Sequence, residues 1–148
     1  MKNSLVAEVS LEINSTPAQV WKALTTPSLI RKYLMGTNVT SNWEAGSSII
    51  YEGEYNGKQY HDKGTIKNII PEKLLQSTYW SSMSGKDDRE ENYNLVTYAL
   101  TSLGAKTVLT VTQDNIADEN ERQHSLKNWH DVLAKMREVV ENEKMQAH

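Results

Sequence analysis

The stretch LVAEVSLEINSTPAQVWKALTTPSLIRKYLMG, residues 5–36, decides the fold. Residues 5–13 alternate apolar and polar side chains, which is the pattern of a strand with one buried face. Thr16 then offers a helix cap, Pro17 suits the first helical position, and Gln19 completes a capping box. The sequence therefore predicts a strand that is followed at once by a short helix.

A second helix start follows directly. Thr26 and Pro27 repeat the cap-and-proline signal, and Gly36 ends the apolar pattern that comes after them. Two short helices placed directly after the first strand are a distinctive order, and they leave most of the buried strand face to be covered by another element.

The middle of the chain predicts only strands. Asn56 and Gly57 form a strong hairpin signal, and a second hairpin is expected around residues 102–105. The polar segment 81–91 is expected to be a mobile loop. The predicted strands cover residues 47–55, 58–70, 73–80, 93–100 and 106–113.

One long helix is expected last. Asp118 and Glu121 suit its start, and apolar side chains then recur every three or four residues. It is the only predicted element long enough to cover most of an antiparallel sheet. A curved sheet that grips one long helix encloses a space between them, and such spaces often bind small molecules. The chain is therefore predicted to form a single α+β domain over residues 1–148.

Composition narrows the function classes. The formal net charge is −3 with scattered basic residues, which argues against nucleic-acid binding. The absence of cysteine excludes thiolate metal sites and disulfides. There is no export signal or apolar run of membrane-spanning length, so we expect a cytoplasmic protein without a membrane span. The chain has no phenylalanine but 7 tyrosines and 4 tryptophans, so its large rings carry polar tips.

Several motifs, in this order and spacing, resemble the START-related (SRPBCC) superfamily with the helix-grip fold, which includes birch-pollen-allergen-like proteins. Within it, the chain is most similar to the branch of activator of heat shock protein 90 ATPase homologues. The resemblance covers nearly the whole chain and rests on residues 16–25, Pro27, residues 64–66, Pro71, Leu74, residues 107–113, Trp129 and Leu133. It implies a cavity for lipids, hormones, flavonoid-like compounds or polyketides.

Seven residues are predicted to line such a cavity. From the last helix these are Trp129, Leu133 and Met136, where Trp129 could either anchor the core or stack on a flat ligand. From the sheet, the inward faces are predicted to carry Tyr51, Trp80, Tyr98 and Gln113. Gln113 ends an apolar row, so its amide either meets a ligand or water or marks the exit of the strand to solvent. A slip of one residue in strand register would reverse these faces.

The sequence offers few candidate catalytic residues. None of the four histidines shows metal-binding spacing, and neither a phosphate-binding glycine loop nor a nucleophile elbow occurs. His61 and Asp62 form the only acid–base pair of interest, but neighbours on a strand point to opposite faces. We therefore expect no catalytic residues, no metal and no cofactor.

Three functions follow from these observations, in order of support. The first is non-enzymatic binding or transport of a small hydrophobic ligand, lipid-like or aromatic. The second, which the resemblance implies, is a co-chaperone-like or stress-response interaction module, with a protein partner or a homodimer. The third is a cyclase-like enzyme.

Overall fold

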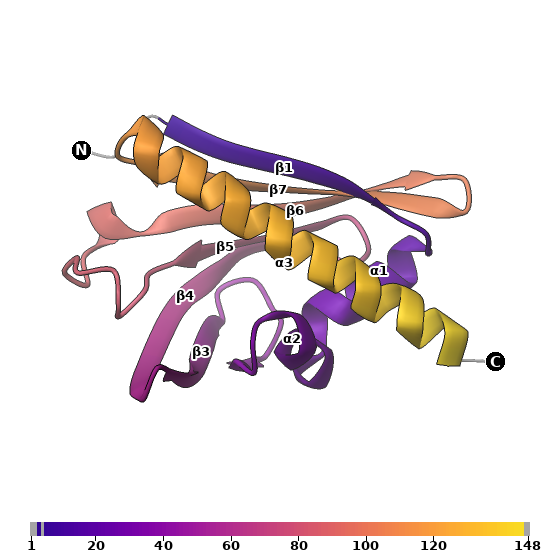
Figure 1. The fold of residues 1–148 in the computed structure, drawn as a ribbon, viewed down its shortest axis with the longest axis horizontal. Coiled ribbons are helices and arrows are strands. Elements are labelled where there is room, and N and C mark those ends of the chain that lie inside the picture. The colour runs from indigo at the N-terminus through magenta and orange to yellow at the C-terminus, as the bar shows by residue number, and fades with distance from the viewer. Residues whose placement is uncertain (1–2, 4, 147–148) are drawn as a thin grey trace.

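The computed structural model describes residue 3 and residues 5–146 of the chain. One antiparallel sheet of seven strands curves around a long C-terminal helix, in the strand order β1-β7-β6-β5-β4-β3-β2 (Figure 1). The predicted α+β class and helix-grip architecture are confirmed. The elements are β1 Leu5–Ile13, α1 Pro17–Thr25, α2 Pro27–Tyr33, β2 Asn38–Ser41, β3 Ser48–Tyr55, β4 Lys58–Ile70, β5 Leu74–Tyr79, the short 3-10 helix η1 Glu90–Asn92, β6 Asn94–Leu103, β7 Lys106–Ile116 and α3 Glu119–Gln146.

The two short helices form as their sequence signals predict. The Thr16 hydroxyl accepts a hydrogen bond from the backbone N–H of Gln19 at 3.3 Å, which caps α1. The buried Tyr33 at the end of α2 donates its hydroxyl to the carbonyl of Ala23 on α1, at 2.9 Å. This bond joins α2 to α1, and Figure 1 shows both helices at one end of the long helix.

The Asn56-Gly57 hairpin sets the register of β3 against β4. Both residues have positive φ, 52° and 79°, as a two-residue type I′ turn requires. Tyr55 consequently pairs with Lys58, and the same register places Tyr51 directly opposite Asp62. The turn therefore determines which side chains of these two strands lie side by side.

The apolar stripe of α3 forms the core with the inner face of the sheet. Leu133 and Met136 on the helix are each 0% exposed, as are Leu109 and Val111 on β7. Contacts of α3 with strands are made mainly with β1 and β7. The helix therefore covers one side of the curved sheet and leaves the inner face of the strands beyond β6 less covered.

Two parts of the fold differ from the sequence-based expectation. The short edge strand β2 was not predicted, because it is only 4 residues long and its alternation is too brief to be distinctive. Strands β6 and β7 continue past the predicted ends to Leu103 and Ile116, where Ile116 pairs with Leu5 of β1.

Two glycines without positive φ lie where another part of the chain approaches their backbone closely. A Cβ added at Gly64 would lie 1.7 Å from the backbone carbonyl oxygen of Thr78, beside the bulge between β4 and β5. A Cβ at Gly53 would meet the hydroxyl end of the Tyr60 side chain at 2.4 Å. The backbone carbonyl of Thr78 cannot move aside as the end of the Tyr60 side chain can. Gly64 is therefore expected to tolerate a larger residue less well than Gly53.

We predict that Gly64→Ala destabilises the fold much more than Gly53→Ala. The Gly64 variant should lose stability at or above the upper end of the about 1–3 kcal/mol typical of overpacking. The Gly53 variant should lose less, because Tyr60 can rotate. Urea unfolding of both variants measures this difference, and equal losses would contradict the close approach of β4 and β5.

Candidate ligand-binding cavity

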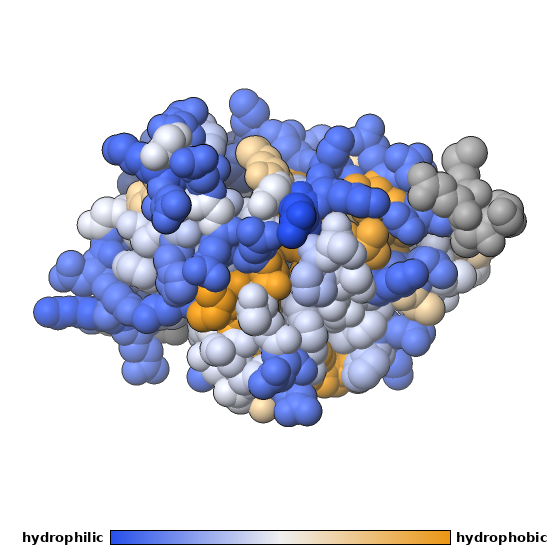
Figure 2. Space-filling view, turned by 90° about the horizontal axis from the view of Figure 1, so that it is seen from below, coloured by the Kyte–Doolittle hydropathy of each residue, from blue (hydrophilic) through white to orange (hydrophobic). Residues whose placement is uncertain are grey.

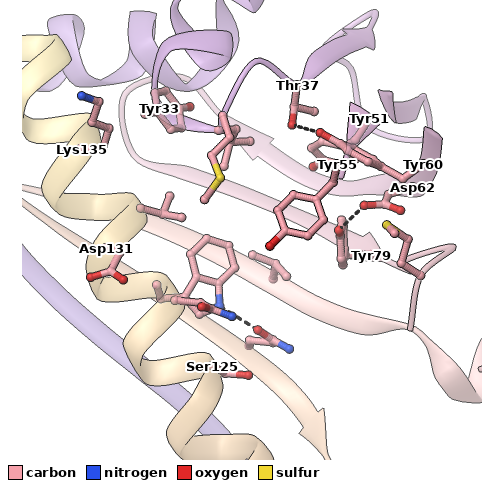
Figure 3. A pocket seen from close by; sticks show the side chains of 18 of the residues that line it. Tyr33, Thr37, Tyr51, Tyr55, Tyr60, Asp62, Tyr79, Ser125, Asp131 and Lys135 are labelled. Carbon is pink, nitrogen blue, oxygen red and sulfur yellow. Dashed lines mark hydrogen bonds between the residues drawn. The ribbon is translucent and has the colours of Figure 1, made fainter. Parts of the chain in front are cut away.

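A cavity of about 900 Å³ lies between α2, α3 and the inner face of the sheet. Its lining is dominated by tyrosine: six of the chain's seven tyrosines contribute to it (Figure 3). These are Tyr33, Tyr51, Tyr55, Tyr60, Tyr79 and Tyr98. The volume is within the range of small-molecule sites, about 300–1,000 Å³.

The helix side of the cavity is organised around Trp129. Its indole N–H donates a hydrogen bond of 2.7 Å to the side-chain carbonyl oxygen of Gln113 on β7. Its ring meets Tyr98 of β6 edge to face, with centroids 5.9 Å apart. Trp129 therefore does two things at once: it packs against the core and lines the cavity.

The Tyr98 hydroxyl faces the cavity. No hydrogen-bond partner for it occurs among residue 3 and residues 5–146, and it is not among the fully enclosed polar atoms. Burial of the ring raises the pKa of Tyr98. The group is therefore a neutral hydroxyl that remains free to bond a ligand or water. The Gln113 amide lines the same cavity, with its oxygen already used by Trp129.

At the other side of the cavity, Asp62 of β4 is held by neutral donors. One carboxylate oxygen accepts from the Tyr79 hydroxyl at 2.6 Å, and the other accepts from the backbone N–H and hydroxyl of Ser82, at 2.9 and 3.2 Å. Tyr51 packs edge-on against Tyr79, with ring centroids 5.4 Å apart. Desolvation, followed by the Asp62 hydrogen bond, raises the pKa of Tyr79, and desolvation raises that of Tyr51.

The mouth of the cavity carries exposed apolar side chains. Met35 after α2 is 87% exposed, Tyr55 at the end of β3 is 57% exposed, and Met83 is also exposed; all three line the cavity. Seen from below, apolar surface emerges in patches among polar side chains (Figure 2). Figure 3 shows the Tyr55 ring projecting into the cavity from its strand. These side chains are exposed and also line the cavity, so they lie where it meets solvent.

Four of the seven predicted residues line this cavity: Tyr51, Tyr98, Gln113 and Trp129. Whether they bind a ligand stays a prediction. Leu133 and Met136 do not line it, so their placement there was wrong. Both side chains are fully buried in the core, whereas their neighbours Val132 and Lys135 on an adjacent face of α3 line the cavity.

The prediction that Trp80 faces inward was also wrong. Its ring stacks on Tyr93 with centroids 6.5 Å apart, and its indole N–H donates to the carbonyl of Lys86. The inner face of β5 instead carries Leu75, Ser77 and Tyr79, paired with β6. The sequence is ambiguous here, since Leu74-Leu75 and Tyr79-Trp80 each offer one apolar residue to either face.

The sequence-based reading missed Tyr33, Tyr60 and Tyr79, and it considered Asp62 only as an acid–base residue. Two of these could have been found from the hairpin, because the Asn56-Gly57 turn places Asp62 opposite Tyr51 and Tyr60 opposite Gly53. The inward position of Tyr79 follows the regular pairing of β5 with β6, which the sequence does not decide because apolar side chains occur on both faces of β5.

His61 and Asp62 point to opposite faces of β4, as expected. The exposed His61 ring contacts Glu52 through Nδ1 at 3.2 Å, whereas Asp62 is buried. Within the described part of the chain, no group of three or more histidine, aspartate or glutamate side chains could hold a metal ion. No helix in that part is long and apolar enough to cross a membrane.

A curved antiparallel sheet, a gripping C-terminal helix and a cavity between them define a helix-grip protein of the START-related superfamily. The sequence profile of the family described as "Activator of Hsp90 ATPase homolog 1-like protein" matches residues 14–141, and the chain belongs to this family. Among curated proteins, none matches the chain significantly.

Solved structures agree with this assignment. The chain is 40% identical to ChR145 from Cytophaga hutchinsonii, with 98% of this chain and 99% of that chain covered and a TM-score of 0.84. It shares the fold of MLL2253 from Mesorhizobium loti, at 20% identity, 93% and 98% coverage and a TM-score of 0.76. It also shares the fold of the protein in the Aha1 dimer from Colwellia psychrerythraea, at 16% identity, 92% and 96% coverage and a TM-score of 0.73.

The hydrogen bond between Trp129 and Gln113 gives a first test of the cavity wall. Gln113→Leu should cost about 1 kcal/mol or more, because the indole N–H loses its acceptor. Gln76→Leu is the matched control, since Gln76 bonds Thr97 on the opposite face of the sheet. Urea unfolding measures both, and an equal or smaller loss for the Gln113 variant would contradict this role.

Buried tyrosines predict a loss of stability in alkali. The pKa values of Tyr33, Tyr51, Tyr79 and Tyr98 are all raised above 10.0 in the fold, chiefly by desolvation. The unfolded chain therefore releases these protons first, so stability is complete below pH 10 and falls as the pH rises beyond it. Each group contributes about 1.4 kcal/mol per pH unit in that window.

Tyrosinate absorbance and circular dichroism, followed together during an alkaline titration, check this prediction. Absorbance from these four groups should appear only with loss of the fold, and the denatured protein supplies the reference titration. Ionisation of all seven tyrosines near pH 10 in a protein that stays folded would contradict the prediction.

Proposed function

We propose that this protein is a non-enzymatic binding protein, acting in the cytoplasm, that holds a small, largely apolar molecule, aromatic or lipid-like, in the cavity under α3. The observation that carries the proposal is the cavity itself: about 900 Å³ lined by tyrosine rings, Trp129 and aliphatic side chains. Such a lining gains about 25 cal/mol for each Å² of apolar ligand surface removed from water.

Polar groups on the lining support selective binding. The Tyr98 hydroxyl has no partner among the described residues, and Gln113 lines the same cavity from the next strand, opposite Val96. A few placed hydrogen-bonding groups in a mainly apolar site fix the orientation of a ligand. The exposed side chains at the mouth, Met35 and Met83, are flexible enough to adapt to a ligand that enters.

Two features support binding over catalysis. His61 and Asp62 are on opposite faces of β4, so they cannot act on one substrate together. Asp62 is occupied by three neutral donors from Tyr79 and Ser82. A cyclase-like activity would need an acid–base pair that converges on the cavity, and His61 does not reach it.

A co-chaperone-like role, with a protein partner or a homodimer, is the second candidate. The family description and the Aha1 dimer from Colwellia psychrerythraea favour it. An interaction surface of this kind would be supported by an apolar patch on the outer sheet or on α3. Of the six large exposed hydrophobic residues that the structure describes, three instead lie at the cavity mouth, which favours ligand binding.

Filling the cavity tests the first candidate. Val132 lines it from α3, and Val132→Trp should abolish binding by occupying the space. Val6→Trp is the control, because Val6 is exposed on β1 outside the cavity. We would titrate all three proteins by calorimetry with 2-naphthalenemethanol and dodecanoic acid, after circular dichroism has shown that each is folded.

Saturable binding that is lost only in Val132→Trp is the expected result. Absence of binding to the unchanged protein, together with no small molecule in native mass spectra of freshly purified material, would overturn the proposal. Undiminished binding by the folded Val132→Trp variant would also contradict it, because the ligand would then lie elsewhere.

A further inference from the structure

We propose that the ligand carries a cationic group, an ammonium of an amine or quaternary amine, and that this group binds beside Asp62 among the tyrosine rings. The inference rests on the proposed function and adds the chemical class of the ligand. It predicts a molecule with a flat or aliphatic apolar body and one positive end.

The first observation is a buried carboxylate without a cation. Asp62 is only 7% exposed, yet it lines the cavity. Its three hydrogen-bond donors, from Tyr79 and Ser82, are all neutral. Neutral donors orient and partly stabilise a carboxylate, but a buried charge is normally balanced by an opposite charge or a metal. No lysine, arginine or histidine of the described chain forms an ion pair with it.

The nearest cation along the chain is directed elsewhere. Lys63 follows Asp62 on β4 and therefore points to the outer face, where its ammonium bonds Asp88 at 2.5 Å. The same ammonium lies 5.9 Å from the centroid of the Trp80 ring. The outer face thus already pairs a cation with a carboxylate and an aromatic ring, while the inner face provides the carboxylate and rings but no cation.

The second observation is the arrangement of rings around Asp62. Tyr51 is directly opposite Asp62 on β3, and Tyr79 bonds it from β5. Tyr60 precedes Asp62 by two residues on the same face of β4, and Tyr55 ends the neighbouring strand; Figure 3 labels these four side chains near the carboxylate. Tyrosine ring faces attract cations, by about 2 kcal/mol or more when water is excluded.

The hydroxyls of Tyr51 and Tyr79 stay neutral, so these two tyrosines add no charge of their own. Tyr60 shares a hydrogen bond with Thr37 at 2.5 Å, and both side chains line the cavity. Burial raises the pKa of Tyr51 and of Tyr79, so both remain protonated at neutral pH.

The other charged lining residues also favour a cation over an anion. The two lysines at the cavity, Lys32 and Lys135, are paired with Glu143 at 3.1 Å and Glu138 at 3.5 Å. Of the lining carboxylates besides Asp62, Glu54 has no cationic partner among the described residues. Each of these lysines therefore has a carboxylate partner, whereas Asp62 and Glu54 have no cationic partner among the described residues.

Three probes that share one apolar body test the inference: (2-naphthylmethyl)trimethylammonium, 2-naphthalenemethanol and 2-naphthoate. Calorimetry on the unchanged protein should show the cation binding about tenfold more tightly than the neutral alcohol, with the carboxylate weakest. Equal affinity for the cation and the alcohol, or preference for the anion, would overturn the inference and leave the proposed function standing. Binding of none of the probes would overturn the inference, and it would overturn the proposed function too when native mass spectra also show no small molecule.

A variant locates the charge that is responsible. Asp62→Asn should reduce the preference for the cation while affinity for the alcohol stays the same. Asp87→Asn changes the net charge equally at an exposed loop position outside the cavity, and it should leave the preference unchanged. A folded Asp62→Asn protein that keeps the full preference would overturn the assignment to Asp62. The order of the three probe affinities for the unchanged protein decides the inference even if the Asp62→Asn variant does not fold.

Discussion

The packing of α3 along one side of the curved sheet is the constraint on which the rest of the structure depends. The helix is fixed against β1 and β7 by fully buried side chains such as Leu133, Met136 and Val111. Toward its N-terminal half the contact changes: Trp129 reaches Gln113 by a hydrogen bond and Tyr98 by its ring edge. The cavity lies beside this contact and is lined by α3 and by strands β3 to β7.

Tyrosine side chains give the wall of that cavity both apolar ring surface and hydrogen-bonding groups. The chain contains no phenylalanine, so each large ring that faces the cavity brings a polar tip or an indole N–H with it. Some tips are used to fix the wall, as in the bonds from Tyr33 to Ala23 and from Tyr79 to Asp62. The Tyr98 hydroxyl is not used in this way by any described residue, and it is the kind of group that a ligand would engage. One residue type therefore supplies both rigidity and recognition.

The sequence predicted the architecture well because local signals agreed with the global fold. Alternation located β1, the Thr16 cap started α1, and the Asn56-Gly57 turn set β3 against β4. The cavity was predicted only in part. Where a strand has apolar side chains on both faces, as at Tyr79 and Trp80, its sequence does not decide which face turns inward, and the pairing with the neighbouring strand does. Which residues of α3 line the cavity and which enter the core, as Val132 and Met136 respectively do, likewise depends on packing that no short pattern encodes.

The most direct test of the account is a two-dimensional NMR titration that follows the indole N–H signals of the four tryptophans. With 2-naphthalenemethanol as the probe, the Trp129 signal should move saturably, because its N–H lies at the cavity wall. The Trp80 signal should stay in place, since that ring is on the opposite face of the sheet. Movement of Trp80 with Trp129 unchanged, or no movement of either, would contradict the claim that this cavity receives a ligand.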